Sequence, residues 1–230
     1  MKITSVLIFI FFCSVFVYCE QVKNESEVKK SPKDIVDYFL ILPEESLDAY
    51  FHGMSFQQRL EFLYINDSFD LTIDTKNAYL SIVGNYDMQT MKQAVTYFTK
   101  ADKSRIIAVS KAVPDMMFGE QVITVFYEYK DEKFIDVTSK IVPKLTLQLF
   151  VSKGYQSMIT EEINQAAKFN IELPQIGTVC KATAAGISKP LIEESLWDLV
   201  DEILQNKEFN IIELKWNKQK GKFEFGKKYK

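Results

Sequence analysis

Short apolar runs separated by tight polar turns constrain the fold of this chain more than any other feature. The runs are residues 94–99, 105–113, 122–129 and 134–137. Lys, Asp and Ser crowd the two turns between paired runs, at 100–104 and 130–133, as is typical of hairpins. A further turn at 74–77 separates two more short runs. The pattern predicts an antiparallel meander of five or six strands.

Several of these runs are apolar on both faces, which sets what must pack around the sheet. Ile106 to Val109 is apolar without interruption, and Val122 and Phe126 lie on the face opposite Ile123 and Val125. In a sheet with one face in water, apolar and polar residues alternate more regularly along each strand. We therefore expect cover on both faces, from helices on one side and from a helix, a second sheet or a partner on the other.

Helical patterns flank the predicted sheet. Ser31-Pro32-Lys33-Asp34 is typical of a helix start with Ser31 as the N-cap, and Ser55 with Gln58 fits a capping box. Residues 190–205 carry a helical apolar stripe, and residues 212–225 form a closing hairpin. We therefore expect an α+β fold, with N-terminal helices, a central antiparallel β-meander, and a C-terminal helix and β-hairpin.

The N-terminus is typical of an export signal. Lys2 precedes an apolar run over 3–18 that ends at Cys19, and a polar stretch follows. We expect a signal peptide at 1–19, a flexible tether at 20–31 and a single globular domain at 32–230. Three outcomes stay open: cleavage after Cys19, lipidation of Cys19 as in bacterial lipoproteins, and an uncleaved anchor. Tyr18 departs from the lipoprotein pattern, and the run is short for a membrane span.

The composition limits which partners and which disulfide bonds can be expected. The net charge of −3 gives no electrostatic reason to expect nucleic acid. Seven lysines between Lys215 and Lys230 are typical of a protected strand edge, with contact to an anionic membrane as the alternative. Cys13 and Cys19 belong to the signal, so Cys180 is the one cysteine expected in the body, without a disulfide.

Two segments carry a resemblance. Asn77-Ala78-Tyr79-Leu80 and the stretch from Tyr127 to Thr138 resemble segments of uncharacterised secreted or lipoprotein-type envelope proteins of bacteria. The resemblance implies export and carries no functional residues to this chain.

Candidate nucleophiles and bases are few. His52 is the one histidine, so a catalytic Ser-His-Asp triad or Cys-His dyad would have to use it. Ser46 and Ser55 are near it in sequence and Cys180 is distant, but no nucleophile-elbow pattern surrounds any of them. We interpret His52 as a surface or capping residue between helices. No catalytic, cofactor-binding or metal-binding residue is assigned, and no cofactor is expected.

Carboxylates and aromatic residues support two alternative functions. A hydrolase would use a pair of acids from the group Glu44, Glu45, Asp67, Asp70 and Asp74. A carrier of small apolar molecules would need a cavity lined by residues such as Phe126 and Tyr97. Asn24 and Asn66 begin N-glycosylation triplets, which matter only in a host with that machinery.

These observations favour an exported envelope protein, freely secreted, periplasmic or anchored by a lipid at Cys19. Its expected role is non-enzymatic, in binding an envelope protein or another macromolecule or in supporting an assembly. The carboxylate hydrolase and the apolar carrier are the alternatives. The sequence leaves the oligomeric state open.

Overall fold

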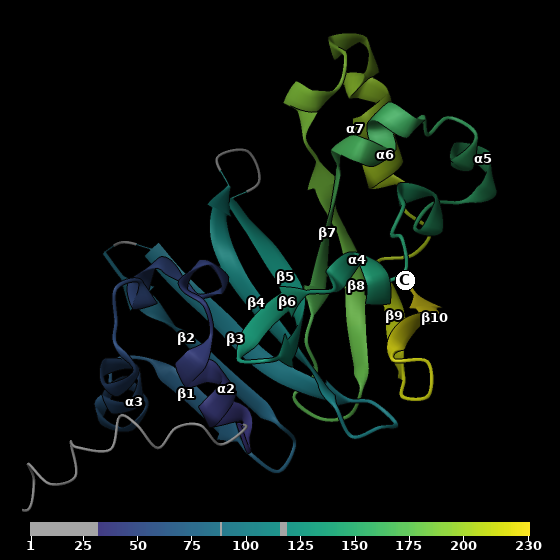
Figure 1. The fold of residues 1–230 in the computed structure, drawn as a ribbon. Helices are drawn as coiled ribbons and strands as arrows, with labels where there is room; N and C mark the ends of the chain where they lie inside the picture. The colour runs from purple at the N-terminus through teal and green to yellow at the C-terminus, as the bar shows by residue number, and fades with distance from the viewer. Residues whose placement is uncertain (1–31, 88, 116–118) are drawn as a thin grey trace, which may run out of the picture. The chain divides into compact units, whose positions relative to one another are not determined.

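The computed structural model describes residues 32–87, 89–115 and 119–230 (Figure 1). The expected signal peptide, the tether, Cys19, Asn24 and Ser31 lie outside the described residues. Residues Asp34–Lys230 form one compact unit, to which the following description applies.

Ten strands build two antiparallel sheets. The first sheet is a meander of six strands in chain order: β1 (Asp70–Asp74), β2 (Tyr79–Tyr86), β3 (Gln89–Thr99), β4 (Arg105–Asp115), β5 (Gly119–Lys130) and β6 (Lys133–Asp136). The second sheet has the order β10-β9-β8-β7: β7 (Ala167–Glu172), β8 (Val179–Ile187), β9 (Ile211–Asn217) and β10 (Lys222–Tyr229).

The helices are short. They are α2 (Ile35–Ile41), α3 (Phe56–Ile65), α4 (Thr138–Ile141), α5 (Lys153–Gln156), α6 (Glu161–Ala166) and α7 (Trp197–Gln205). Single 3₁₀ turns lie at Glu44–Ser46, Ala49–Phe51, Leu147–Leu149, Lys189–Leu191 and Glu194–Leu196. Of the described residues, 42% lie in strands and 28% in α-helices or 3₁₀ turns.

The predicted fold class, α+β with N-terminal helices, a meander, and a C-terminal helix and β-hairpin, is wrong. The protein is mostly antiparallel β, and the expected C-terminal hairpin is half of a four-stranded sheet. Strand β8 is difficult to predict over its full length because it carries Ala182, Ala184 and Gly186, which have little intrinsic preference for strands. Its pairing with β9 joins Cys180 to Leu214, a long-range contact that local pattern cannot reveal.

The helix ends also differ from two of the expectations. The first helix begins at Ile35, where the Asp34 side chain accepts hydrogen bonds from two backbone N–H groups, so Asp34 rather than Ser31 is its N-cap. The expected helix over 190–205 is two 3₁₀ turns followed by α7, because the backbone is extended at Ile192. The capping box of Ser55 and Gln58 is confirmed.

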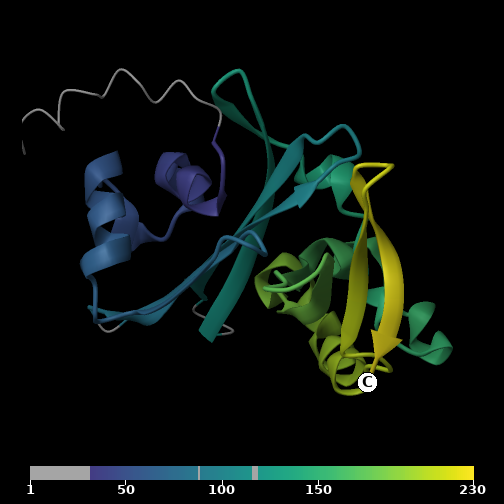
Figure 2. The same ribbon diagram turned by 90° about the horizontal axis from the view of Figure 1, so that it is seen from below.

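Both faces of the middle of the six-stranded sheet are covered, as predicted. Helices α2 and α3 and the turns between them pack on one face, and the four-stranded sheet packs on the other (Figure 2). Each interface has its own apolar cluster. Phe39, Phe51 and Ile107 belong to the helix-side cluster, whereas Phe98 and Phe126 belong to the cluster between the sheets.

Candidate functional site

Among the described residues, no serine or cysteine side chain is hydrogen-bonded to the single histidine. His52 is exposed at the end of a 3₁₀ turn between α2 and α3, in agreement with its interpretation as a surface residue. The Ser46 hydroxyl donates to the Pro43 carbonyl at 2.7 Å, and the Ser55 hydroxyl accepts the Gln58 N–H as the cap of α3. Both hydroxyls therefore stabilise local turns.

Cys180 is an inert thiol. Its side chain is fully buried between the sheets, and burial raises the pKa of the thiol. Because the thiolate is the reactive form, this environment suppresses both nucleophilic attack and metal binding. Among the described residues, no three carboxylate, imidazole or thiol groups gather closely enough to hold a metal ion.

The candidate carboxylates are dispersed. Glu44 accepts the Gly53 N–H at 3.0 Å, and Asp74 closes a turn by accepting both the backbone and side-chain N–H groups of Asn77. Asp70 and Asp74 lie on one face of β1 but four residues apart, about 13 Å along a strand. Acid pairs of glycosidases are closer, about 5–9.5 Å apart.

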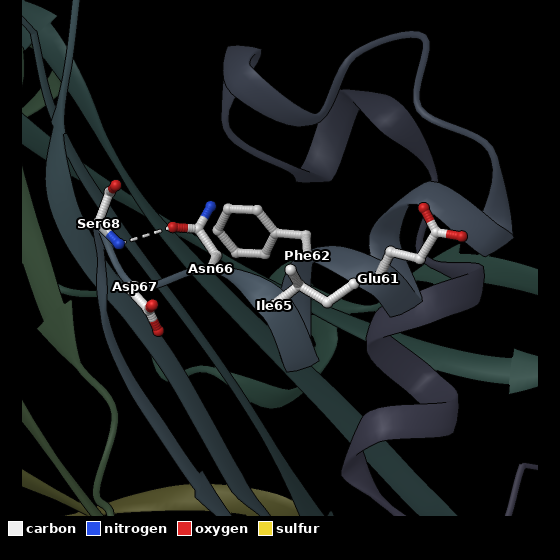
Figure 3. A pocket seen from close by; sticks show the side chains of 6 residues that line it. All are labelled: Glu61, Phe62, Ile65, Asn66, Asp67 and Ser68. Atoms are coloured by element: carbon white, nitrogen blue, oxygen red, sulfur yellow. Dashed lines mark hydrogen bonds between the residues drawn. The ribbon is translucent and has the colours of Figure 1, made fainter.

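A hollow of about 480 Å³ lies at the end of α3 and includes Asp67 and the Asn66 triplet. It is a shallow surface depression lined only by residues of the segment 61–68. Figure 3 shows the carboxylates of Glu61 and Asp67 pointing apart, while Asn66 accepts the Ser68 N–H at 2.9 Å. A ligand here would stay largely in water, so we do not favour this hollow as a binding site.

A deeper cleft lies between the two sheets. Its volume is about 400 Å³, within the range of small-molecule sites. Strand β7 crosses β5, where Thr124 Oγ1 donates to the Ile171 carbonyl at 2.8 Å and Asn170 Oδ1 accepts the Val122 N–H at 3.3 Å. This crossing separates the packed part of the sheet, around Phe126, from the open part that forms the cleft.

Small side chains form the floor of the cleft. Ser81, Ala94 and Ser110 face one another on adjacent strands, in one cross-strand row that continues to Thr124. Larger side chains in this row would fill the space between the sheets. The floor is therefore hollow because its residues are small.

The walls of the cleft come from both sheets. The remaining lining residues on the first sheet are Tyr79, Val83, Lys92, Ala112 and Val122, together with Gln93, whose side-chain amide is hydrogen-bonded on the other face of the sheet. The lining residues on and next to the second sheet are Asn170, Glu172, Leu173 and Thr183. Asn170 pairs with Thr183 across β7 and β8, on the face opposite the buried Ile171 and Ala182. The outer face of this strand pair thus serves as a wall.

A buried polar network lies on the opposite face of the cleft floor. The Tyr86 hydroxyl and the Tyr50 N–H donate to the buried Asp48 carboxylate at 2.7 and 3.0 Å. Gln93 Oε1 accepts the Asp48 N–H at 2.7 Å, and its Nε2 donates to the Ser110 carbonyl at 3.2 Å. The network ties the N-terminal turns to the strands that carry the floor.

Tyr86 should make the stability of the protein sensitive to alkaline pH. Burial, and then the hydrogen bond to Asp48, raise the pKa of Tyr86 to about 12, whereas an unfolded tyrosine ionises near pH 10. Its contribution to stability is thus complete below pH 10 and is lost as the pH rises to 12. We expect Tyr86→Phe to lose less stability than the wild type over this window in urea unfolding. Tyr64→Phe, at an exposed position, is the control, and equal losses in all three proteins would contradict the assignment.

Sequence reasoning missed the cleft because strands far apart in the chain supply its residues. One signal was present: Ser81, Ala94 and Ser110 are small residues at the inward positions of otherwise bulky strands. Without the register of β2, β3 and β4, their alignment in one row could not be seen.

The described residues thus define a mostly antiparallel, two-sheet β protein with a cleft between its sheets. No helix among them is long and apolar enough to cross a membrane. No protein-family model matches the chain, and no curated protein matches it.

A solved structure shares the fold. It is a domain of an uncharacterized protein from Porphyromonas gingivalis W83, similar with a TM-score of 0.53 at 10% identity. The alignment covers 85% of this chain and 99% of that domain. At this identity the likeness shows the fold alone. It agrees with the resemblance to uncharacterised bacterial proteins.

Proposed function

We propose that the chain is an exported protein with a non-enzymatic binding role, whose ligand site is the cleft between the sheets. The cleft of about 400 Å³ between two otherwise packed sheets is the observation that supports this role. Export, by secretion or with a lipid at Cys19, rests on the sequence of the N-terminus. An envelope location follows from the same reasoning.

The alternatives receive less support from the described residues. The candidate acids of a hydrolase are spread over exposed turns and one strand face. The aromatic residues suggested for an apolar carrier lie on opposite faces of the sheet: Phe126 packs between the sheets, and Tyr97 packs on the helix side. They do not line a common cavity.

Blocking the cleft tests the proposal. Ala94→Trp would place an indole on the cleft floor, and Tyr64→Trp places the same group on the exposed face of α3 as a control. Maltose, the dipeptide Ala-Leu and octanoate serve as probes of three chemical classes. At ten times its dissociation constant, a probe that binds should raise Tm by about 3–5 °C in the wild type and in Tyr64→Trp only.

Two results would contradict the proposal: no probe raises Tm, or the rise persists in Ala94→Trp. Thr183→Trp, which fills the cleft from the opposite wall, replaces Ala94→Trp if that variant does not fold.

A further inference from the structure

We infer that the cleft binds an uncharged saccharide of one or two rings. This inference rests on the proposed function and specifies its ligand. Four properties of the cleft carry it: free hydrogen-bonding groups, balanced charge, an aromatic wall and limited volume.

Free hydroxyl groups line the floor and one wall. Within the part of the chain that the structure describes, the hydroxyls of Ser81, Ser110 and Thr183 have no hydrogen-bond partner in the protein. The Asn170 amide uses its oxygen for Val122 and leaves its NH₂ group free. Hydroxyls both donate and accept, so this set is complementary to the hydroxyls of a sugar.

The charges in the cleft are already paired. Lys92 and Glu172 are the charged residues that line it among those described. The Lys92 ammonium nitrogen lies 2.8 Å from a carboxylate oxygen of Glu120. The Glu172 carboxylate lies 3.7 Å from the Lys181 ammonium nitrogen. A free carboxylate or ammonium group of a ligand would therefore meet no unpaired partner. This arrangement favours an uncharged ligand over a fatty acid or a peptide terminus.

The rest of the lining fits the apolar side of a sugar ring. Tyr79 is the aromatic residue of the described lining, and Val83, Ala112 and Val122 lie on the same sheet face. An aromatic side chain offers a flat apolar surface with a polar tip, suited to a ring that has C–H groups on one face and hydroxyls at its edge. The volume of about 400 Å³ is near the lower end for small-molecule sites, which limits the ligand to one or two rings.

Titration calorimetry with maltose and N,N′-diacetylchitobiose tests the inference on the purified protein. We expect saturable binding of at least one of them, abolished by Ala94→Trp. Tyr79→Ala should weaken it about tenfold and Ser81→Ala about fivefold, while Tyr64→Ala, at an exposed position outside the cleft, leaves it unchanged. If Tyr79→Ala does not fold, the weaker binding expected of Ser81→Ala tests whether the saccharide binds in the cleft.

The control probes separate the two proposals. Cleft-dependent binding of Ala-Leu or octanoate without saccharide binding would overturn the saccharide inference and leave the binding role in place. Absence of binding by any probe would overturn both. Saccharide binding that survives Ala94→Trp and Tyr79→Ala would also overturn the inference, since the sugar would then bind outside the cleft.

Discussion

Replacing Phe126 with alanine should lower the free energy of unfolding by about 3–5 kcal/mol, because the change leaves a cavity between the two sheets. Phe126 is fully buried on β5, and its ring centroid lies 5.3 Å from that of Phe223 on β10. The contact joins strands from different sheets. Urea unfolding followed by far-UV circular dichroism measures the loss.

Phe225→Ala is the matched control for this change. Phe225 lies on β10 close to Phe223 but is 43% exposed, so we expect a loss of about 1 kcal/mol or less. In a double-mutant cycle, Phe126 and Phe223 should show a coupling energy of about 0.5–3 kcal/mol. Equal losses for Phe126→Ala and Phe225→Ala, or strict additivity in the cycle, would contradict the packing of the second sheet on the first.

Asp48→Ala should destabilise the protein by about 2–4 kcal/mol, since it leaves two partly buried donors without their partner. The side chain accepts hydrogen bonds from the Tyr86 hydroxyl and the Tyr50 N–H, and the residue is only 6% exposed. Its negative charge also acts on the partly buried Lys111 ammonium, whose pKa is lowered by burial. Unfolding in urea at pH 7 gives the magnitude.

Asp102→Ala is a suitable comparison because Asp102 also closes a turn, accepting from the backbone and side chain of Ser104, but on the exposed surface. We expect Asp102→Ala to lower the free energy of unfolding by about 1 kcal/mol or less. If Asp48→Ala costs no more than Asp102→Ala, the network does not anchor the N-terminal turns to the sheet. Tyr86→Phe should reproduce part of the Asp48→Ala loss, since it removes the hydroxyl alone.

Local features of this protein could be predicted from the sequence. Ser55 and Gln58 cap α3 as expected, and the turns at 100–104 and 130–133 connect paired strands. Each of these features depends on residues only a few positions apart. The strands that are apolar on both faces also indicate cover on both sides of the sheet, because a strand buried on both faces has apolar residues at successive positions.

The arrangement of distant segments was decided by the tertiary structure alone. Cys180 and Leu214 become neighbours through strand pairing, and the Val122 N–H donates a hydrogen bond to the Asn170 side chain where β7 crosses β5. The sequence by itself determined the capping box of α3 and the hairpins of the six-stranded sheet. Only the tertiary structure decided the four-stranded sheet and the cleft, because strand register and sheet crossing depend on contacts between residues far apart in the chain.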